Sequence, residues 1–380
     1  MYIKSLAAKN LAEGWELEEV ELDKNLTLLV GISGAGKTQI LRSLNNLKTI
    51  INGGAVEGFE WKVVFELGEG KVYEWRGKFS MEKDYKPKNG KDKNSNKTKK
   101  NLPPVLFKYD PVELLEEQLI DIINNELLII RKKEETVYIK NQMPKLSKDE
   151  STLHLFQEEE LISEIVQHFN YLLFKDQTRR IDHVILSEQE SRLVFHESGI
   201  EAEQLKITGY NNVFKYSLVE EEIKYLIDTA FIDVFPEIEG VSSRIYFTKD
   251  NKLLKLRIKL KDSDTWIEQE QISSGMLRFL MLLIDLHLSP DGSIFLIDEI
   301  ENSLGINCLD EYVHQLQHAN RNIQIIATSH HPYIINNVPY QQWKIVKREG
   351  ATISVTDAEE LGIGQSRQDA FIQLNKVLSK

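Results

Sequence analysis

A glycine-rich segment, GISGAGKT, runs from Gly31 to Thr38 and follows the pattern G-x-x-x-x-G-K-S/T. The apolar run LTLLV precedes it and QILRSLNNL follows it, which predicts a strand before the loop and a helix after it. A phosphate-binding loop requires this context, and the alternative is a glycine-rich turn without a ligand.

The residue types in this segment suit the phosphates of a nucleotide. Glycines let backbone N–H groups curl around phosphate oxygens, and the start of the following helix favours the same anion. Lys37 would reach the β- and γ-phosphates, and the Thr38 hydroxyl would hold Mg²⁺. The segment therefore predicts binding of ATP and Mg²⁺ by Gly31, Ser33, Gly34, Ala35, Gly36, Lys37, Thr38 and Gln39.

Two acidic residues, Asp298 and Glu299, follow four apolar residues in the segment IFLIDEIEN of 294–302. Acids in this position lie at the carboxyl end of a buried strand, where open α/β sheets bind their ligands. Asp298 would bind Mg²⁺, mostly through water, and Glu299 would orient and deprotonate the attacking water. The alternative is a pair of solvated acids that only end a strand.

The segment IIATSHHPYIINN, 325–337, ends a second apolar strand in polar residues and two histidines before Pro332. His330 would hydrogen-bond the γ-phosphate and report its presence. The alternative is a structural histidine at the sheet edge, and the spacing alone does not decide whether His330 or His331 faces the ligand.

Two serines and a glycine, Ser273, Ser274 and Gly275, stand at the start of an apolar helix about twenty residues before the acidic strand. Serine hydroxyls and free N–H groups at a helix start favour a highly charged anion. Ser273 would equally cap the helix without any ligand, because capping and anion binding use the same geometry.

The elements that must position these residues alternate between strands and helices. Strand patterns cover 2–9, 19–30, 61–67, 71–79, 251–262, 293–298 and 323–329. Helix patterns cover 111–130, 151–174, 217–235, the residues after Gly275 and a segment near 305–319. Strands that alternate with helices late in the chain indicate a buried, largely parallel sheet.

Composition restricts the class of protein. The chain has 380 residues, of which 41% are apolar and 28% charged, as is usual for globular proteins. It has no apolar run as long as a membrane span, and its start, MYIKSLAAKN, lacks the apolar core of a signal peptide. Cys308 is the only cysteine, so we expect no intrachain disulfide and a cytoplasmic location without membrane contact.

One segment contrasts with the net charge of −12, which itself argues against coating nucleic acid with the whole surface. From Lys83 to Lys100 the chain contains eight lysines and almost no apolar residue. Such a stretch buries too little surface to offset ordering, which predicts a solvated loop. Contact between Lys83–Lys100 and nucleic acid or an acidic partner is the alternative.

The order of these motifs resembles the ABC ATPase superfamily, which has a P-loop, a Ser-Gly signature, an acidic strand and a switch histidine. In that superfamily the signature helix closes over the γ-phosphate held by a second copy. Ser273 and Gly275 match the signature serine and second glycine, whereas Ser274 replaces the first glycine and Met276 the usual glutamine. The resemblance implies ATP hydrolysis at composite sites in a homodimer or higher homo-oligomer.

Within the superfamily, three segments are similar to an SMC-like branch that includes the overcoming-lysogenization-defect, Septu and PARIS-type phage-defence ATPases. These segments are SSGMLRFL, LIDEIENSLG and IATSHHPYIINNVP. Glu301 and Asn302 look like the branch's EN pair, whereas Gly305 stands where the branch often has histidine. The family's lid glutamine has no motif here, and Gln142 is one candidate for it.

The resemblance implies an α/β fold class, a P-loop NTPase with an ABC-ATPase head. Such a head has a mixed or parallel sheet flanked by helices, an antiparallel β subdomain and, here, a helical insertion. We expect 1–110 to form the N-terminal part of the head, with a Lys-rich loop at 81–103. A mainly helical insertion would cover 111–245, and 246–380 would complete the head.

The function that the resemblance implies is a sensor or switch in bacterial anti-phage defence. ATP would clamp two heads together, and hydrolysis or a trigger would change how a partner effector is held. Defence ATPases of this branch often carry a Toprim nuclease, for which the residues after Glu299 leave too little room. We therefore expect a separately encoded effector, a nuclease or a toxin.

Three other classes of function compete with this one. A RecF-like or Rad50-like ATPase of DNA repair or chromosomes would need a basic DNA-facing surface, which Lys83–Lys100 would offer. The ATPase subunit of a membrane transporter fits poorly with the degenerate signature. A non-enzymatic binding module fits poorly with the intact P-loop and acidic pair.

Overall fold

The computed structural model of the chain describes most of its residues. The described ranges are 1–68, 70–81, 112–132, 135–138, 141–142, 146–175, 184–196, 199–206, 211–318, 321–363, 372–374 and 376. The Lys-rich segment 83–100 lies outside them. Gln142 falls in the short strand β9 (Asn141–Gln142), where the backbone alone is described.

Within the described residues, one mixed sheet of fourteen strands extends through the molecule. Its order is β10 (Leu172–Lys175), β15 (Ile294–Ile297), β16 (Gln324–Ser329), β3 (Leu26–Val30), β17 (Trp343–Glu349), β18 (Thr352–Asp357), β2 (Trp15–Glu21), β1 (Tyr2–Asn10), β4 (Phe59–Leu67), β5 (Lys71–Phe79), β6 (Leu114–Asp121), β7 (Glu126–Lys132), β8 (Glu135–Tyr138) and β9. Neighbouring strands from β10 to β17 are parallel, and neighbouring strands from β2 to β9 are antiparallel. Between these two halves, β18 pairs antiparallel with β17 and parallel with β2. The predicted α/β class with an antiparallel part is therefore confirmed.

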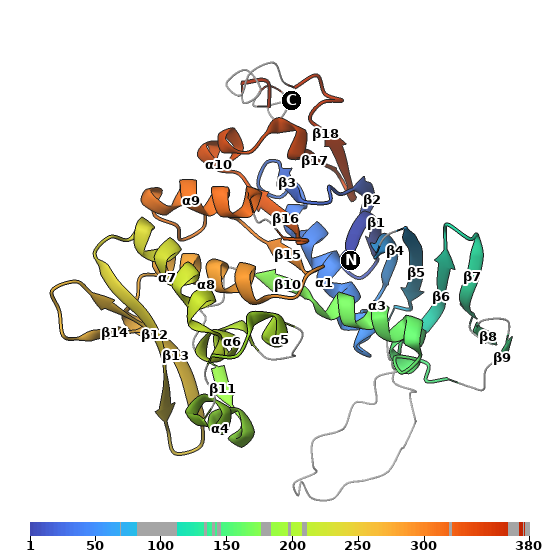
Figure 1. Ribbon diagram of the computed structural model, residues 1–380. Coiled ribbons are helices and arrows are strands. Elements are labelled where there is room, and N and C mark those ends of the chain that lie inside the picture. The colour runs from blue at the N-terminus through green and yellow to red at the C-terminus, as the bar shows by residue number, and fades with distance from the viewer. Residues whose placement is uncertain are drawn as a thin grey trace, which may run out of the picture.

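Helices cover both faces of the parallel half (Figure 1). On one face lie α1 (Lys37–Ile51) and α3 (Glu160–Asn170), and on the other lie α8 (Ser274–Leu288), α9 (Ile306–Gln317) and α10 (Pro332–Asn337). The fully buried β3 shows why both layers are needed. Its Leu28 and Val30 join the cluster around α8, whereas Leu29 joins the cluster around α1. Alternate side chains of a strand face opposite sides, so a β3 covered on one side only would expose apolar side chains on the other.

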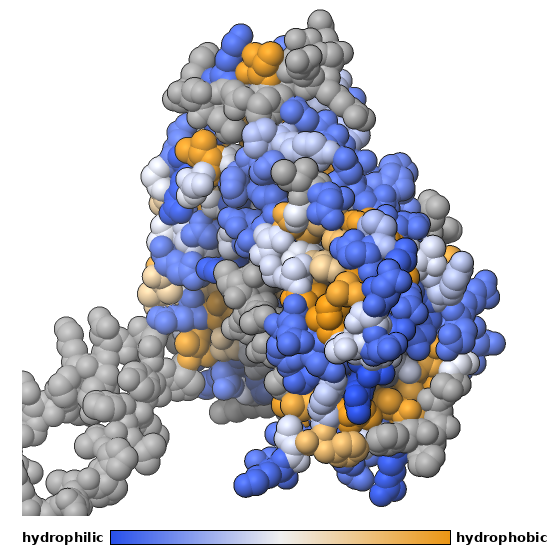
Figure 2. Space-filling view, turned by 90° about the vertical axis from the view of Figure 1, so that its left-hand side faces the viewer, coloured by the Kyte–Doolittle hydropathy of each residue, from blue (hydrophilic) through white to orange (hydrophobic). Residues whose placement is uncertain are grey.

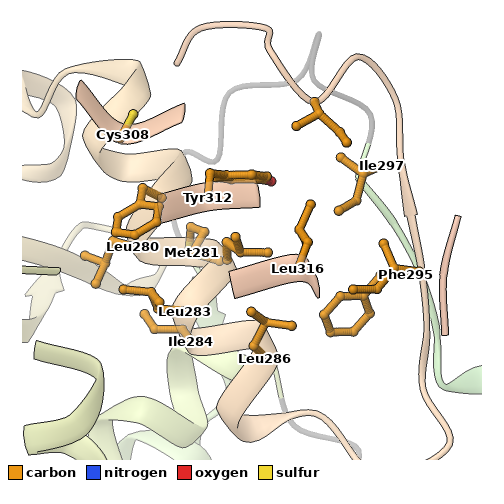
Figure 3. Packing of buried hydrophobic residues seen from close by; sticks show 14 of the residues in the cluster. Leu280, Met281, Leu283, Ile284, Leu286, Phe295, Ile297, Cys308, Tyr312 and Leu316 are labelled. Atoms are coloured by element: carbon orange, nitrogen blue, oxygen red, sulfur yellow. The ribbon is translucent and has the colours of Figure 1, made fainter. Parts of the chain in front are cut away.

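The helix α8 is apolar around nearly its whole circumference, because it lies between the sheet and other helices. Figure 3 shows its side chains meeting those of β15 and α9. The labelled residues of this contact are Leu280, Met281, Leu283, Ile284, Leu286, Phe295, Ile297, Cys308, Tyr312 and Leu316. This packing fixes the start of α8 relative to the end of β15.

An ion pair between a buried carboxylate and a partly exposed lysine joins α8 to the edge strand β10. Asp285, 3% exposed, lies 2.5 Å from Lys175 Nζ and accepts a hydrogen bond from Asn212 Nδ2 at 2.8 Å. Burial lowers the pKa of the neighbouring Lys215 to about 8, although the charge of Asp285 opposes that shift. The carboxylate inside the helix layer is thus fully partnered, as a buried charge must be.

The helix predicted over 111–130 is wrong. The segment forms the hairpin of β6 and β7, which extends the antiparallel half beyond β5. Its turn contains Asn125 at φ 50, a left-handed conformation that asparagine tolerates, and Asp121 Oδ1 accepts from Asn124 N. Glu117, 1% exposed, accepts a hydrogen bond from Trp75 Nε1 in β5. The predicted insertion of 111–245 therefore begins with strands of the main sheet.

Helices dominate the residues that follow. The segment predicted as one helix over 151–174 contains α2 (Thr152–Leu155), α3 and then strand β10. Three short helices come next, namely α4 (Glu188–His196), α5 (Ala202–Lys206) and α6 (Asn212–Leu218). The helix predicted over 217–235 corresponds to α7 (Glu221–Val234), which ends before Pro236. The helix predicted near 305–319 corresponds to α9.

A second, smaller sheet lies beside α7, on the left of Figure 1. It contains β11 (Val184–Leu186), β12 (Ile238–Phe247), β13 (Lys252–Leu260) and β14 (Trp266–Glu268). Figure 2 shows this side of the molecule, where apolar patches interrupt a mainly hydrophilic surface. In the described part of the chain, no helix combines the length and apolar character needed to span a bilayer.

Phe169→Ala tests the packing of α3 on the antiparallel half. Phe169 is fully buried, and its ring packs edge-on against the rings of Phe65 and Trp75. The distances between ring centroids are 5.3 Å to Phe65 and 5.6 Å to Trp75. We expect the free energy of unfolding to fall by about 3–5 kcal/mol, since the truncation leaves a cavity. Urea denaturation measures this change. Ile123→Ala, at a residue 63% exposed, is the control, and equal losses in both variants would contradict the packing.

Candidate functional site

The loop of residues 31–36 joins β3 to α1 through glycine conformations that other residues rarely adopt. Gly34 and Gly36 have φ angles of +84° and +103°. A Cβ on Gly31 would lie 2.5 Å from the Val346 carbonyl oxygen, and one on Gly36 would lie 2.5 Å from Ile353 Cδ1. Larger residues would therefore displace the loop from β17 and β18. Between the glycines, Ser33 is exposed and Ala35 is buried.

Lys37, the first residue of α1, bends back over this loop. Its Nζ donates hydrogen bonds to the carbonyl oxygens of Gly31 at 2.8 Å and Ile32 at 3.1 Å. Burial lowers the pKa of Lys37, and the negative charges of Asp298 and Glu301 oppose that shift. The ammonium group of Lys37 is thus held beside a loop of backbone N–H groups. Together they form a site suited to a phosphate.

The predicted metal ligands Thr38 and Asp298 meet directly, although they are 260 positions apart. Thr38 Oγ1 lies 3.1 and 2.9 Å from the two carboxylate oxygens of Asp298. Thr328 Oγ1, at the end of β16, donates to the same carboxylate at 2.7 Å. A hydroxyl and one carboxylate suit Mg²⁺, which keeps several waters and takes phosphate oxygens as further ligands. Within the described residues no cluster of three acidic, His or Cys side chains offers another metal site.

Glu299 is held by its backbone and presents an unpaired carboxylate. Its φ of +50° is left-handed, a conformation that costs a non-glycine residue about 1–3 kcal/mol. Its N–H donates to Thr328 Oγ1 at 2.7 Å, and its carbonyl oxygen accepts from Arg278 Nη2 at 2.9 Å. The side chain is exposed, and its carboxylate has no partner among the described residues. This arrangement fixes the backbone and leaves the carboxylate available to a water molecule.

The two histidines after β16 differ in what they contact. His331 caps α10, because its Nδ1 accepts from Tyr333 N at 3.3 Å. His330 Nδ1 instead lies 3.0 Å from the Glu301 carboxylate. The geometry therefore favours His330 over His331 as the histidine available to a ligand.

The signature segment begins α8 as the sequence predicts. Ser273 is the N-cap, and its Oγ accepts from Met276 N at 3.3 Å, while Ser274 is exposed in the first turn. Gly275 is buried, and a Cβ there would lie 2.6 Å from the Ser303 carbonyl oxygen. Within the described residues these three make no hydrogen bond to the P-loop of their own chain. Gly275 thus has a packing role beside any ligand.

Several contacts of this region escaped the sequence-based prediction of the site, including those of Glu301, which the sequence marked only through the resemblance of its EN pair. Thr328, Ser329 and Glu301 make hydrogen bonds that tie the acidic loop to the end of β16. Arg278 reaches Glu299, and Arg348 Nη1 donates to the side chain of Gln39 at 3.2 Å. Two features of the sequence could have identified these residues: the polar run before His330, and Glu301, the second acid after Asp298.

Comparison with known proteins identifies one matching family model. The model is described as "AAA domain, putative AbiEii toxin, Type IV TA system" and matches residues 26–336. These residues extend from the first residue of β3 into α10. They include the P-loop, the signature segment, the acidic pair and His330. No curated protein matches the sequence.

Solved structures similar to the chain include three heads of SMC proteins. One SMC head, bound to the C-terminal winged-helix domain of ScpA, has a TM-score of 0.48 and 11% identity, over 94% of this chain and 97% of that one. The SMC head domain from Thermotoga maritima has 0.43 and 11%, over 94% and 99%. A Pyrococcus furiosus SMC head with an extended coiled coil, bound to the C-terminal domain of ScpA, has 0.44 and 13%, over 99% of both chains.

Thr328→Val tests the link between Asp298 and Glu299. Valine has nearly the same shape but cannot bond the Asp298 carboxylate or accept the Glu299 N–H. We expect the free energy of unfolding to fall by about 1–3 kcal/mol in urea denaturation, because buried polar groups lose their partner. Thr49→Val, at an exposed hydroxyl of α1, is the matched control. Equal stability of the two variants would argue against the link.

Proposed function

Because the chain belongs to this family of AAA domains, and is an AAA-type ATPase domain, we propose that it hydrolyses Mg·ATP at the edge of its parallel sheet. The family match confirms the predicted class of ATPase, whereas membership of the phage-defence branch stays a prediction. The observation that carries the proposal is the meeting of Thr38, Asp298 and Thr328 from three separate elements beside Lys37.

The residues divide the reaction among them. Lys37 and the N–H groups of the glycine loop hold the β- and γ-phosphate oxygens. Thr38 and Asp298 would hold Mg²⁺, which supplies charge neutralisation on the phosphates when bound. Glu299 takes a proton from water as the water oxygen bonds to the γ-phosphorus. The bond from that phosphorus to the bridging oxygen breaks, and the products are ADP and phosphate. His330 donates a hydrogen bond to the γ-phosphate.

We further propose that each site is completed by a second copy of the chain. Ser273, Ser274 and Gly275 carry the free N–H groups of a helix start but are not hydrogen-bonded to their own P-loop. Two copies facing each other would place each signature segment on the γ-phosphate of the other. ATP would then hold a dimer or larger homo-oligomer together, and hydrolysis would release it, which is a switch.

As a switch, the protein would control a separately encoded effector, a nuclease or a toxin, in anti-phage defence in the bacterial cytoplasm. The description of the family names a toxin of a type IV toxin–antitoxin system, which supports a toxic effect as the output. Purifying the ATP-bound protein from its host and identifying the bound chains tests this. Recovery of ATPase subunits alone, in every nucleotide state, would count against a partner effector.

Lys37→Ala should weaken ATP binding by at least about tenfold, since the loop loses its one ammonium and the charge-assisted hydrogen bonds it makes to phosphate. Titration with a fluorescent ATP analogue measures the dissociation constant. Lys71→Ala, an exposed lysine of β5 paired with Glu164, is the control and should bind as the wild type does. Unchanged affinity in Lys37→Ala would overturn the P-loop assignment.

Glu299→Gln should keep ATP binding and lose at least about a hundredfold in kcat, because an amide cannot take the proton. The variant should also accumulate a larger ATP-dependent assembly, visible by light scattering after size-exclusion chromatography. Glu239→Gln, in a surface ion pair of β12, is the control. Normal turnover in Glu299→Gln would remove Glu299 from the mechanism, and a monomer that ignores ATP would remove the composite site.

A further inference from the structure

Glu301 is a buried carboxylate that the mechanism above does not use. Its side chain is 9% exposed and accepts hydrogen bonds from two consecutive residues. Ser329 Oγ donates to Oε2 at 2.8 Å, and the His330 N–H donates to Oε1 at 3.0 Å. His330 Nδ1 lies 3.0 Å from the same Oε1. The hydrogen bonds from Ser329 Oγ and the His330 N–H already tie Glu301 to the end of β16, so the imidazole contact invites a functional explanation.

The surrounding backbone holds Glu301 in a fixed relation to the acidic pair. Its loop leaves β15 beside β16, and the Ile300 N–H donates to the Thr328 carbonyl oxygen at 3.0 Å. The Asn302 N–H donates to the Glu299 carbonyl oxygen at 2.9 Å, which closes a turn around Glu301. One carboxylate, that of Glu301, therefore fixes the position of the His330 imidazole relative to Glu299, the residue that would activate water.

The contact determines which imidazole nitrogen is available. A carboxylate on one ring nitrogen favours the tautomer with the proton on that nitrogen and fixes the ring orientation. With Nδ1–H donated to Glu301, the other nitrogen, Nε2, has no partner among the described residues, and the side chain is half exposed. Nε2 is thus the ring atom that a γ-phosphate would meet, and it would donate to that anion as an N–H, with the ring carrying a second proton between the phosphate and the Glu301 carboxylate.

We propose that Glu301 is a positioning residue, which orients His330 through Nδ1 so that Nε2 faces the γ-phosphate. This inference rests on the proposed ATP hydrolysis and adds to it the group that sets the histidine's geometry. Glu301 itself touches neither phosphate nor water in this role. It acts through His330, so removing His330 should remove the effect of Glu301.

Glu301→Gln and His330→Ala, singly and together, test this dependence. Glutamine has a single carbonyl oxygen, which can accept from the His330 N–H and Nδ1–H while its NH₂ group donates to Ser329 Oγ, and its neutral bond to Nδ1 is roughly half as strong. We expect kcat to fall about 10–100-fold in Glu301→Gln, with the dissociation constant for an ATP analogue within about threefold of wild type. In the His330→Ala background, Glu301→Gln should produce no further loss. Losses that multiply would overturn the proposal, because they would show that Glu301 acts independently of His330.

A second measurement does not depend on turnover. In nucleotide-free protein labelled with ¹⁵N-histidine, the His330 signals, assigned by their loss in His330→Ala, report which ring nitrogen carries the proton. We expect protonated Nδ1 and bare Nε2 in the wild type, and a mixture of tautomers in Glu301→Gln. The same tautomer population in both proteins would overturn the proposal.

The matched control is Glu311→Gln, since Glu311 also faces a histidine ring nitrogen, that of His314 at 3.6 Å on α9. It should leave kcat and the His330 signals unchanged. A wild-type protein that binds but never hydrolyses ATP would refute the proposed function. Wild-type hydrolysis with full activity in Glu301→Gln would refute the positioning role alone.

Discussion

The hydrogen bonds between Thr38, Asp298 and Thr328 depend on the parallel order of β15, β16 and β3. Parallel neighbours end at the same edge of a sheet, so residues from distant parts of the chain meet there without long side chains. Buried residues on both faces hold this order, because each central strand supplies side chains to two helical layers. Reversing any one of these strands would separate the phosphate loop from the acids that serve it.

At the same edge, the backbone of the acidic loop is held in place, while side-chain atoms that could react stay free. Thr328 and Arg278 anchor the two backbone polar groups of Glu299, which supports its left-handed conformation. Glu301 in turn gathers Ser329 and His330. The main chain of this loop is therefore hydrogen-bonded at successive residues. The carboxylate of Glu299 and Nε2 of His330 stay without a partner among the described residues.

The sequence allowed prediction of the parts of the site that depend on local pattern. The strand–loop–helix around Lys37, the acids after four apolar residues and the cap at Ser273 are each written in one short segment. The contact of Glu301 with His330 spans 29 positions and depends on strand order, which no local pattern contains. The segment 111–130 misled for a related reason, since pairing with β5 and a turn at Asn125 outweighed its helical spacing.

The edge strand β10 limits how much of the chain can be deleted. It comes from the middle of the chain, yet it flanks β15, and its Lys175 neutralises Asp285 within α8. Deleting the middle of the chain as a removable module would leave the edge of β15 open to pairing with strands of other molecules. It would also leave the charge of Asp285 without its lysine partner among leucines. A fragment trimmed to the motif-bearing ends would therefore aggregate instead of behaving as a minimal catalyst.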